Sequence, residues 1–305
     1  MTKIEFNRRG RTLLPGQVAQ LITIDSDGTG RTVLFETDSV IEAPNWTPDG
    51  QSLIVNAGGE LWQFPAEPGG GDPRRIEVGP ERDFNNDHVL SPDGQTIYAS
   101  DNDGHIYAVP IAGGTPRRVS NEHATPHHYY LHGISPDGLT LSYVAIEKPA
   151  GERRINMFTI PAAGGPDTRL SDVDYPNDGP EYSPDGRWIY FSSERAAKVP
   201  GHAQCFRMAT DGSEIEQLTF DDRVNWFPHV SPDGHAIVFI SYPAGTTGHP
   251  PNKDVILRFM RPDGSGQRDI VSFFGGQGTL NVNSWAPDSR RFAYVAYPMS
   301  DRSAD

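Results

Sequence analysis

Three histidines and one glutamate stand at the same place relative to a repeated turn. His88, His132, Glu181 and His229 each lie three or four residues before the proline of a Ser-Pro-Asp-Gly segment. Equivalent positions of a repeated unit face the same way, so we expect these side chains to converge from four different units. Imidazoles combined with a carboxylate suit Zn²⁺, Mn²⁺, Fe²⁺ or Ni²⁺. The sequence therefore predicts a divalent-metal site on His88, His132 and His229.

Further polar and aromatic residues lie close to these positions in the chain. We predict that they form a ligand-binding site, which comprises Asn86, Asp87, Asp178, Glu181, Trp226, Gln277 and Asn283. Two other interpretations stay open. The site could bind a polar ligand without a metal, or its side chains could only hydrogen-bond channel water and cap strand ends. Metal ligands that come from separate repeats form no short-spacing motif, so the spacing of these residues does not decide between the three interpretations.

Other candidates for chemistry are weaker. Trp226, Phe227, Tyr129 and Tyr130 could stack on a sugar, or they could pack between neighbouring repeats. Cys205 lies in an apolar run and is interpreted as a small core residue. The sequence contains no recognisable Ser-His-Asp nucleophile elbow and no Cys-His pair. Nucleophilic hydrolysis is therefore not predicted.

The elements that position these residues are set by a turn that occurs six times. Its copies are Thr47-Pro48-Asp49-Gly50, Ser91-Pro92-Asp93-Gly94, Ser135-Pro136-Asp137-Gly138, Ser183-Pro184-Asp185-Gly186, Ser231-Pro232-Asp233-Gly234 and Ala286-Pro287-Asp288-Ser289. Successive prolines are 44, 44, 48, 48 and 55 residues apart. Proline presets φ for the second position of a turn, and Asp and Gly suit the positions that follow. Each copy therefore joins two short antiparallel strands.

Four strands in each of six repeats predict an all-β fold, a six-bladed β-propeller with four antiparallel strands per blade. We expect residues 1–305 to form a single propeller domain. The N-terminal strands within 18–37 should complete the last blade and close the ring. The predicted blades are 41–80, 84–120, 128–172, 176–220, 225–272 and 279–298.

The order of the strands separates two faces of the ring. One face should carry the tight Pro-Asp-Gly turns and Gly-rich hairpins. The other should carry the variable connections, including the long segments 194–203 and 242–253. Function usually lies on loops held by a rigid scaffold. We therefore predict a functional site on the loop-rich face, at the mouth of the central channel.

Composition limits the classes of partner. With 26 Lys and Arg against 40 Asp and Glu, the net charge is 26 − 40 = −14. An acidic surface repels phosphate backbones, so nucleic-acid binding is not expected. The single cysteine excludes an intrachain disulfide, and no apolar run is long enough for a membrane span. We expect a monomer that is cytoplasmic, since the N-terminus lacks a signal sequence, or periplasmic if a leader was removed.

The segments Asp178-Gly-Pro-Glu-Tyr-Ser-Pro-Asp-Gly186 and Asn225-Trp-Phe-Pro-His-Val-Ser-Pro-Asp-Gly234 carry a family resemblance. Over about residues 18–297 the chain resembles the TolB-like six-bladed propellers of the PD40 (WD40-like) repeat type, including uncharacterised bacterial members. The resemblance implies the propeller fold. The chain has no room for the separate N-terminal domain of TolB, which argues against a role in the Tol-Pal system.

Two functions follow from these observations, and the sequence does not decide whether the protein is an enzyme. The first is a TolB-like propeller that binds a ligand or a partner protein at the channel mouth. The alternative is a divalent-metal-dependent carbohydrate-active enzyme, a lyase or hydrolase, with a histidine cluster in the channel. This second function is similar in kind to oligogalacturonate lyases, propellers that hold a divalent metal on His and Gln side chains. No residue is assigned as its catalytic base.

Overall fold

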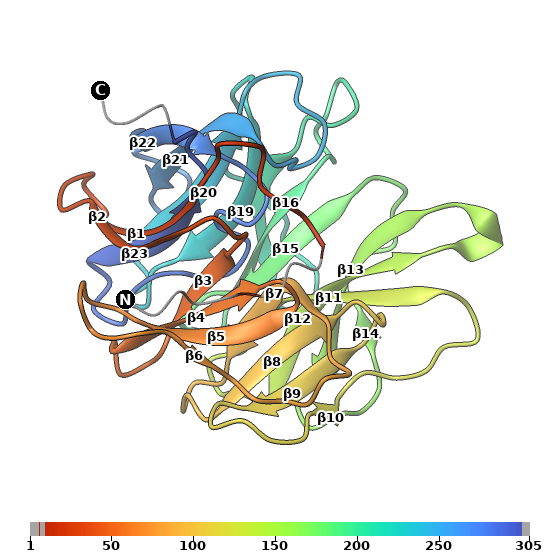
Figure 1. Cartoon of the computed structure of the whole chain (residues 1–305). Coiled ribbons are helices and arrows are strands. Elements are labelled where there is room, and N and C mark those ends of the chain that lie inside the picture. The colour runs from red at the N-terminus through yellow and green to blue at the C-terminus, as the bar shows by residue number, and fades with distance from the viewer. Residues whose placement is uncertain (1–5, 7–9, 301–305) are drawn as a thin grey trace.

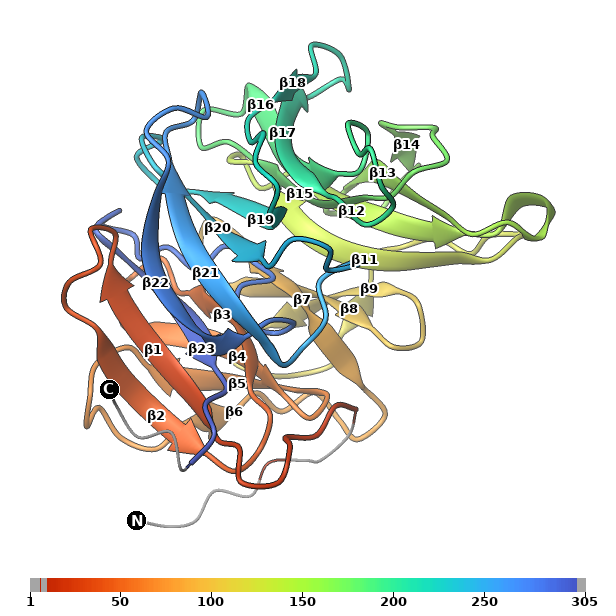
Figure 2. The ribbon, with the colours of Figure 1, turned by 90° about the horizontal axis from the view of Figure 1, so that it is seen from above.

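The computed structural model describes Phe6 and residues 10–300, which form six antiparallel sheets arranged as the blades of a propeller (Figures 1 and 2). The first three blades contain β3 (Glu42–Trp46), β4 (Ser52–Ala57), β5 (Glu60–Pro65) and β6 (Arg74–Arg75); β7 (Phe84–Leu90), β8 (Thr96–Asp101), β9 (Ile106–Pro110) and β10 (Arg117–Arg118); and β11 (His127–Ile134), β12 (Thr140–Glu147), β13 (Arg154–Pro161) and β14 (Thr168–Arg169). The next two contain β15 (Asn177–Tyr182), β16 (Trp188–Ser193), β17 (Gln204–Ala209) and β18 (Glu216–Gln217); and β19 (Val224–Val230), β20 (Ile237–Tyr242), β21 (Lys253–Met260) and β22 (Arg268–Gly275).

The sixth blade closes the ring with both ends of the chain. Its strand β1 (Ala19–Asp25) pairs with β2 (Thr32–Thr37) on one side and with β23 (Arg291–Ala296) on the other. This confirms the six-bladed propeller and its closure by N-terminal strands. The blade differs from the others in its inner strand, which is reduced to one bridge between Trp285 and Phe292. Here the backbone N–H of Trp285 donates to Oδ1 of Asn283 at 3.0 Å. This bond competes with regular strand pairing.

The repeated turn uses its serine and aspartate side chains together. In the second copy, Ser91 Oγ donates to Asp93 Oδ1 at 2.5 Å, and the backbone N–H of Gln95 donates to the same oxygen at 3.0 Å. Gly94 follows with φ of 69°, a left-handed conformation in which a β-carbon is unfavourable. These contacts fix where each first strand ends and each second strand begins.

Each of the five regular inner strands contains a break in its pairing. The register shifts between Glu42 and Asn45, Phe84 and His88, Leu131 and Gly133, Asp178 and Glu181, and Trp226 and His229. Such bulges bend a strand and redirect its side chains. At Gly179, with φ of 64°, an added β-carbon would lie 2.9 Å from the ring of Phe227, so the bulges also bring neighbouring blades into close contact.

Apolar side chains from adjacent blades form the core. One cluster joins Ile24, Trp226, Tyr242 and Phe292 from the last two blades, and the other blades pack in the same way. Cys205 is completely buried in such a cluster, and burial raises the pKa of its thiol. No helix in the described part of the chain is long and apolar enough to cross a membrane.

Candidate functional site

A cavity of about 500 Å³ opens at the end of the channel that carries the long connections. Five of the blades and the segment 242–253 contribute to it. Its polar wall includes Asn86, Asp87, Asp178 and Gln277, while Tyr130, Val144, Ile146 and Ile155 form an apolar wall. Five of the predicted ligand-binding residues, these four and Trp226, therefore line one cavity, together with the predicted metal ligand His132.

One side chain from each blade occupies an equivalent position near the channel mouth. These side chains stand six residues before each turn proline, and they are Glu42, Asn86, Tyr130, Asp178, Trp226 and Asn281. Five of them line the cavity, and Glu42 lines a smaller cavity beside it. The bulge that follows this position turns the next residues toward the neighbouring blade. Counting back six rather than three or four residues would have found Asn281 from the sequence, and it would have grouped Tyr130, considered there only for sugar stacking, with the polar candidates.

Asp178 joins two histidines at the floor of the cavity. Its Oδ1 lies 3.0 Å from Nε2 of His132, and its Oδ2 lies 3.3 Å from Nε2 of His249. The other ring nitrogen of His249 is 2.5 Å from Oε1 of Gln277. We call Asp87, His132, Asp178, His249 and Gln277 the mouth cluster.

These contacts set opposite protonation preferences within the mouth cluster. Burial opposes the charge on His132, but Asp87 and Asp178 outweigh it and raise the pKa of the imidazole to about 9. Burial also opposes the charge on Asp178, yet its bonds to His132 and His249 lower its pKa below the usual range. Burial likewise opposes the charge on His249, whose pKa is nevertheless raised by Asp178. At neutral pH the site therefore contains an imidazolium beside a carboxylate.

Asp87 is the exception in this cluster. It is 5% exposed and lines the cavity. Burial raises the pKa of its carboxyl to about 6, an effect that the charge of His132 reduces. Within the described residues its carboxylate accepts no hydrogen bond, while its backbone N–H donates to Oδ1 of Asn85 at 2.9 Å. A charged group is thus buried at the cavity wall without a bonded partner.

Glu181 and His229, which were predicted to lie with the other histidines, instead form a closed contact deeper in the channel. Nδ1 of His229 is 2.5 Å from Oε2 of Glu181, and the backbone N–H of Val230 donates to Oε1 at 3.0 Å. Asn283 Nδ2 donates to the same Oε1 at 2.7 Å. Asn45 Nδ2 then donates to the carbonyl of Asn283 at 2.6 Å. These bonds link four blades in series.

His88 also binds the neighbouring blade rather than the other histidines. Its Nε2 lies 3.3 Å from the carbonyl oxygen of Ile54, and burial lowers the pKa of its imidazole to about 4. We call Asn45, His88, Glu181, His229 and Asn283 the inner belt. The three predicted metal ligands therefore have three separate sets of partners. In the described residues, no three His, Cys, Asp or Glu side chains are grouped so that they could hold a metal ion, and the metal site stays a prediction.

Most of the aromatic residues considered for sugar stacking pack inside the protein and do not expose a ring face to the cavity. Trp226 and Phe227 are 3% and 2% exposed, and Tyr129 is fully buried. The indole N–H of Trp226 donates to the carbonyl of Gly248 at 3.0 Å. Tyr130 is half-buried and lines the cavity, so the apolar wall contains one accessible aromatic ring.

The segment 242–253 lies over part of the cavity and was noted from the sequence only for its length. His249 packs edge-on against the rings of Trp226 and Phe227, with centroid distances of 5.0 and 4.9 Å. The carbonyl of Pro250 accepts a bond from the backbone N–H of Gln277 at 3.2 Å. His249 and Gln277 thus hold the segment against the mouth cluster. No spacing in the sequence indicates this contact, because it joins two blades through a loop.

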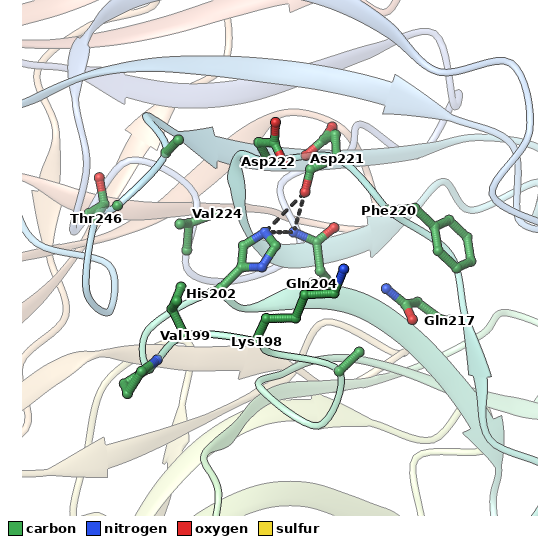
Figure 3. A pocket seen from close by; sticks show the side chains of 14 residues that line it. Lys198, Val199, His202, Gln204, Gln217, Phe220, Asp221, Asp222, Val224 and Thr246 are labelled. Atoms are coloured by element: carbon green, nitrogen blue, oxygen red, sulfur yellow. Dashed lines mark hydrogen bonds between the residues drawn. The ribbon is translucent and has the colours of Figure 1, made fainter.

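A second cavity, of about 530 Å³, lies between the fourth and fifth blades (Figure 3). Two of its polar side chains, His202 and Gln204, are directed at each other and at the backbone. His202 Nε2 and Gln204 Nε2 lie 3.0 and 3.4 Å from the carbonyl of Asp221 (Figure 3). Exposed Phe220 and Val199 form part of the rim.

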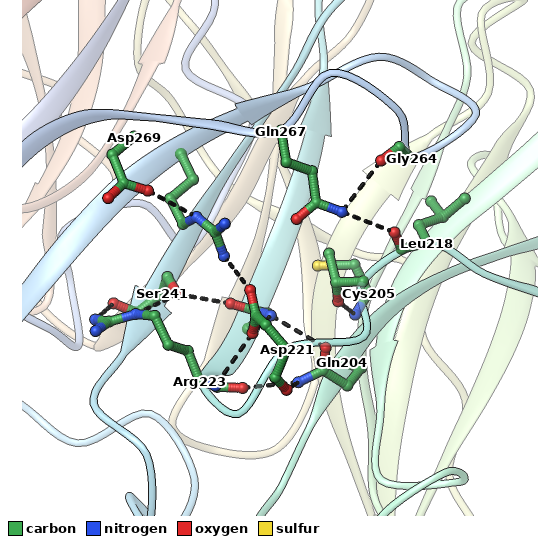
Figure 4. Close-up of polar contacts among 12 residues, drawn as sticks. Gln204, Cys205, Leu218, Asp221, Arg223, Ser241, Gly264, Gln267 and Asp269 are labelled. Carbon is green, nitrogen blue, oxygen red and sulfur yellow. Dashed lines mark hydrogen bonds and ion pairs between the residues drawn. The ribbon is translucent and has the colours of Figure 1, made fainter.

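The carboxylate of Asp221 in this region is fully bonded (Figure 4). Its Oδ1 accepts the backbone N–H of Arg223 at 3.1 Å and the amide of Asn225 at 3.0 Å, and its Oδ2 pairs with Arg258. Arg258 is also bonded to Asp269. Unlike Asp87, this partly exposed acid has a partner on each oxygen and needs no other, so the mouth cavity is the stronger candidate for a binding site.

Comparisons with known proteins place the chain among bacterial propellers. Residues 133–256 match the TolB beta propeller domain family. An uncharacterised protein of Agrobacterium fabrum is 39% identical over 269 residues, which cover 87% of each chain. A solved structure from Agrobacterium tumefaciens, provisionally described as TolB, superposes with a TM-score of 0.83 at 37% identity and covers 92% of this chain and 99% of that one.

The protein belongs to the TolB-like propeller family of the PD40 repeat type. The Tol-Pal system protein TolB of Francisella tularensis is 25% identical over 280 residues, which are 89% of this chain and 60% of that protein. The chain therefore spans about three-fifths of the length of that relative. The family resemblance inferred from the repeated turns is confirmed.

Proposed function

We propose that this propeller binds a small polar ligand, or a side-chain-sized part of a partner protein, in the cavity at the channel mouth. The observation that carries this proposal is Asp87, a buried carboxylate on the cavity wall with no bonded partner in the described residues. Burying an unpaired charge costs free energy, and a bound hydrogen-bond donor recovers part of that cost. The cavity volume of about 500 Å³ lies within the range of ligand sites.

A thermal-shift screen tests this function. The panel contains amines, neutral sugars, sugar acids and simple carboxylates at millimolar concentration. A ligand at a hundred times its Kd stabilises the folded state by about 2.7 kcal/mol, which a melting curve detects. We expect at least one class of compound to raise the Tm.

Two tryptophan variants identify where such a compound binds. Ile146→Trp fills the apolar wall of the cavity, whereas Leu139→Trp adds the same side chain at an exposed turn residue outside the cavity. The ligand-induced shift should vanish in the first variant and persist in the second. A panel without any stabilising compound, or a shift that survives Ile146→Trp, would contradict the proposal.

The alternative from the sequence is a divalent-metal-dependent carbohydrate-active enzyme. The residue types around Asp178 suit a metal, but their nitrogens and oxygens bond one another and no group of three described side chains is arranged for an ion. Titration with Mn²⁺ or Zn²⁺ tests this alternative. A rise in Tm that His132→Ala removes would favour it, and unchanged melting would count against it.

A further inference from the structure

We propose that the group seated against Asp87 is a protonated primary amine carried on an apolar stem. This inference rests on the proposed function, since it names the chemical class of ligand for the same cavity. It is drawn from the charges that line the cavity and from the apolar wall beside them.

Three carboxylates line the cavity, and two of them have partners. Asp178 is placed between two imidazoles, with one oxygen directed at each ring. Glu194 accepts the backbone N–H of Gly201 at 2.8 Å. Asp87 is the one that accepts no hydrogen bond from a described residue. A ligand would therefore gain most at this wall by donating hydrogen bonds to the carboxylate of Asp87.

The neighbours of Asp87 do not supply the missing donor. The imidazole of His132 directs its Nε2 at Asp178. Arg153 also lines the cavity, but it forms no hydrogen bond or ion pair with Asp87 in the described residues. Arg11, which lines the smaller cavity beside it, pairs with Glu42 at 2.9 Å. An ammonium group brings three N–H donors and a full positive charge to this position. Its charge-assisted bonds to a carboxylate are about twice as strong as those of a neutral hydroxyl group, and a carboxylate ligand would be repelled.

The apolar wall of the same cavity suits an alkyl stem. Val144, Ile146 and Ile155 lie together on the paired strands β12 and β13, and Tyr130 lies next to them on β11. A stem of a few methylene groups would remove apolar surface from water on this wall while its ammonium group reaches Asp87. A sugar, with hydroxyl groups on every side, would leave some of them unbonded against these aliphatic side chains.

A matched series of small probes tests the inference. Butylamine, butanol and butyrate share one stem and differ in charge, and their Kd values are measured by NMR titration at neutral pH. We expect butylamine to bind most tightly. Asp87→Asn keeps the shape of the side chain and should weaken butylamine about tenfold or more, because it removes a charged hydrogen-bond partner.

Asp103→Asn is the control for overall charge. Asp103 lies in the turn after β8, does not line the cavity and pairs with Arg82, so this variant should bind butylamine as the parent does. Equal affinity for butanol and butylamine, or unchanged amine affinity in Asp87→Asn, would overturn the inference. If other compounds still bind in a manner that Ile146→Trp abolishes, cavity binding stands and only the amine is wrong. If nothing binds, both fail.

The amine could come from a free metabolite or from a lysine side chain of a partner. Nα-acetyl-lysine amide and Nα-acetyl-norleucine amide differ only in the ammonium group and separate these sources. A lysine derivative that binds at least tenfold more tightly than butylamine would assign the site to a peptide. Equal or weaker binding would assign it to a free amine. A norleucine derivative that binds as tightly as the lysine derivative would contradict recognition of the amine itself.

Discussion

The inner belt and the mouth cluster lie in the same channel and use the same residue types, yet their polar groups are satisfied differently. In the inner belt, both oxygens of Glu181 accept bonds, from His229, Val230 and Asn283. In the mouth cluster, Asp178 is bonded on both oxygens while Asp87 is not bonded by any described residue. In the inner belt, Nδ1 of His88 and Oδ1 of Asn45 have no hydrogen-bond partner, but the carboxylate of Glu181 is fully bonded and fixes structure. In the mouth cluster it is a carboxylate on a cavity wall that lacks a bond, and this indicates a place for a ligand. Four variants or conditions test this difference, and their expected effects on stability decrease from one to the next.

Glu181→Ala should have the largest effect. It removes the acceptor for a buried imidazole and for two N–H groups that link neighbouring blades. Each buried donor left without an acceptor costs about 1–3 kcal/mol, so the three together should cost about 3–5 kcal/mol. Urea denaturation should therefore show a loss of this size in the free energy of unfolding. The control is Glu216→Ala, which removes an exposed pair with Arg207 and should cost less than about 1 kcal/mol. Similar losses for the two variants would refute the structural role of the inner belt.

Asp178→Asn should have a smaller effect that spreads into the segment 242–253. The variant keeps one acceptor oxygen but loses the charge that holds His132 and His249. Since the carboxylate is partly exposed to the cavity, we expect a loss of about 1–3 kcal/mol. Hydrogen exchange should become faster around His249, because its contact with Asp178 ties the segment to the cluster. Unchanged exchange there would show that Gln277 alone holds the segment.

Raising the pH should destabilise the protein through His132. Its pKa is raised from 6.5 to about 9 in the folded state. The stabilisation from its charge is therefore fully present below pH 6.5 and is lost as the pH rises through about 9. The loss should reach at most about 3 kcal/mol, the upper end of the range for Asp178→Asn, because both changes break the same ion pair. Unfolding free energies between pH 6 and 10 measure it, and His132→Gln should flatten the curve. A wild-type curve as flat as that of the variant would contradict the ion pair.

Asp87→Asn should change stability least. The carboxylate has no bond to lose within the described residues, and its burial penalty disappears in the amide. We expect a change of less than about 1 kcal/mol at neutral pH, because the burial penalty that disappears and the lost attraction to the His132 imidazolium oppose each other. Thermal unfolding without ligand checks this. A loss as large as that of Glu181→Ala would place Asp87 in the structural network and remove the main support for the binding site.

Much of the fold could be predicted because the repeated turn is determined by its own residues. Proline, aspartate and glycine at fixed places define where two strands meet, and their recurrence gives the number of blades. The reduced inner strand of the last blade could not be predicted in the same way. It depends on the side chain of Asn283 bonding the backbone of Trp285, which is a local competition between two hydrogen bonds.

The candidate site was predicted in part. Asn86, Asp87, Asp178, Trp226, Gln277 and His132 were singled out and line one cavity. His88, Glu181, His229 and Asn283 were singled out by the same counting, but they bond neighbouring blades. His249 and Tyr130 line the cavity as well, and no spacing in the sequence groups His249 with the others. Metal binding on the three predicted histidines stays a prediction.

By itself, the sequence determined that this protein is a ring of six similar units with its chemistry at the start of each inner strand. Local rules of turn geometry and strand alternation are enough for that conclusion, since they act over a few residues. Only the tertiary structure decided which side chains face the cavity and which join the blades. The reason is the bulge in each inner strand, which changes the direction of side chains within three positions. A bulge depends on the neighbouring strand and blade, so the pattern of one strand does not reveal it.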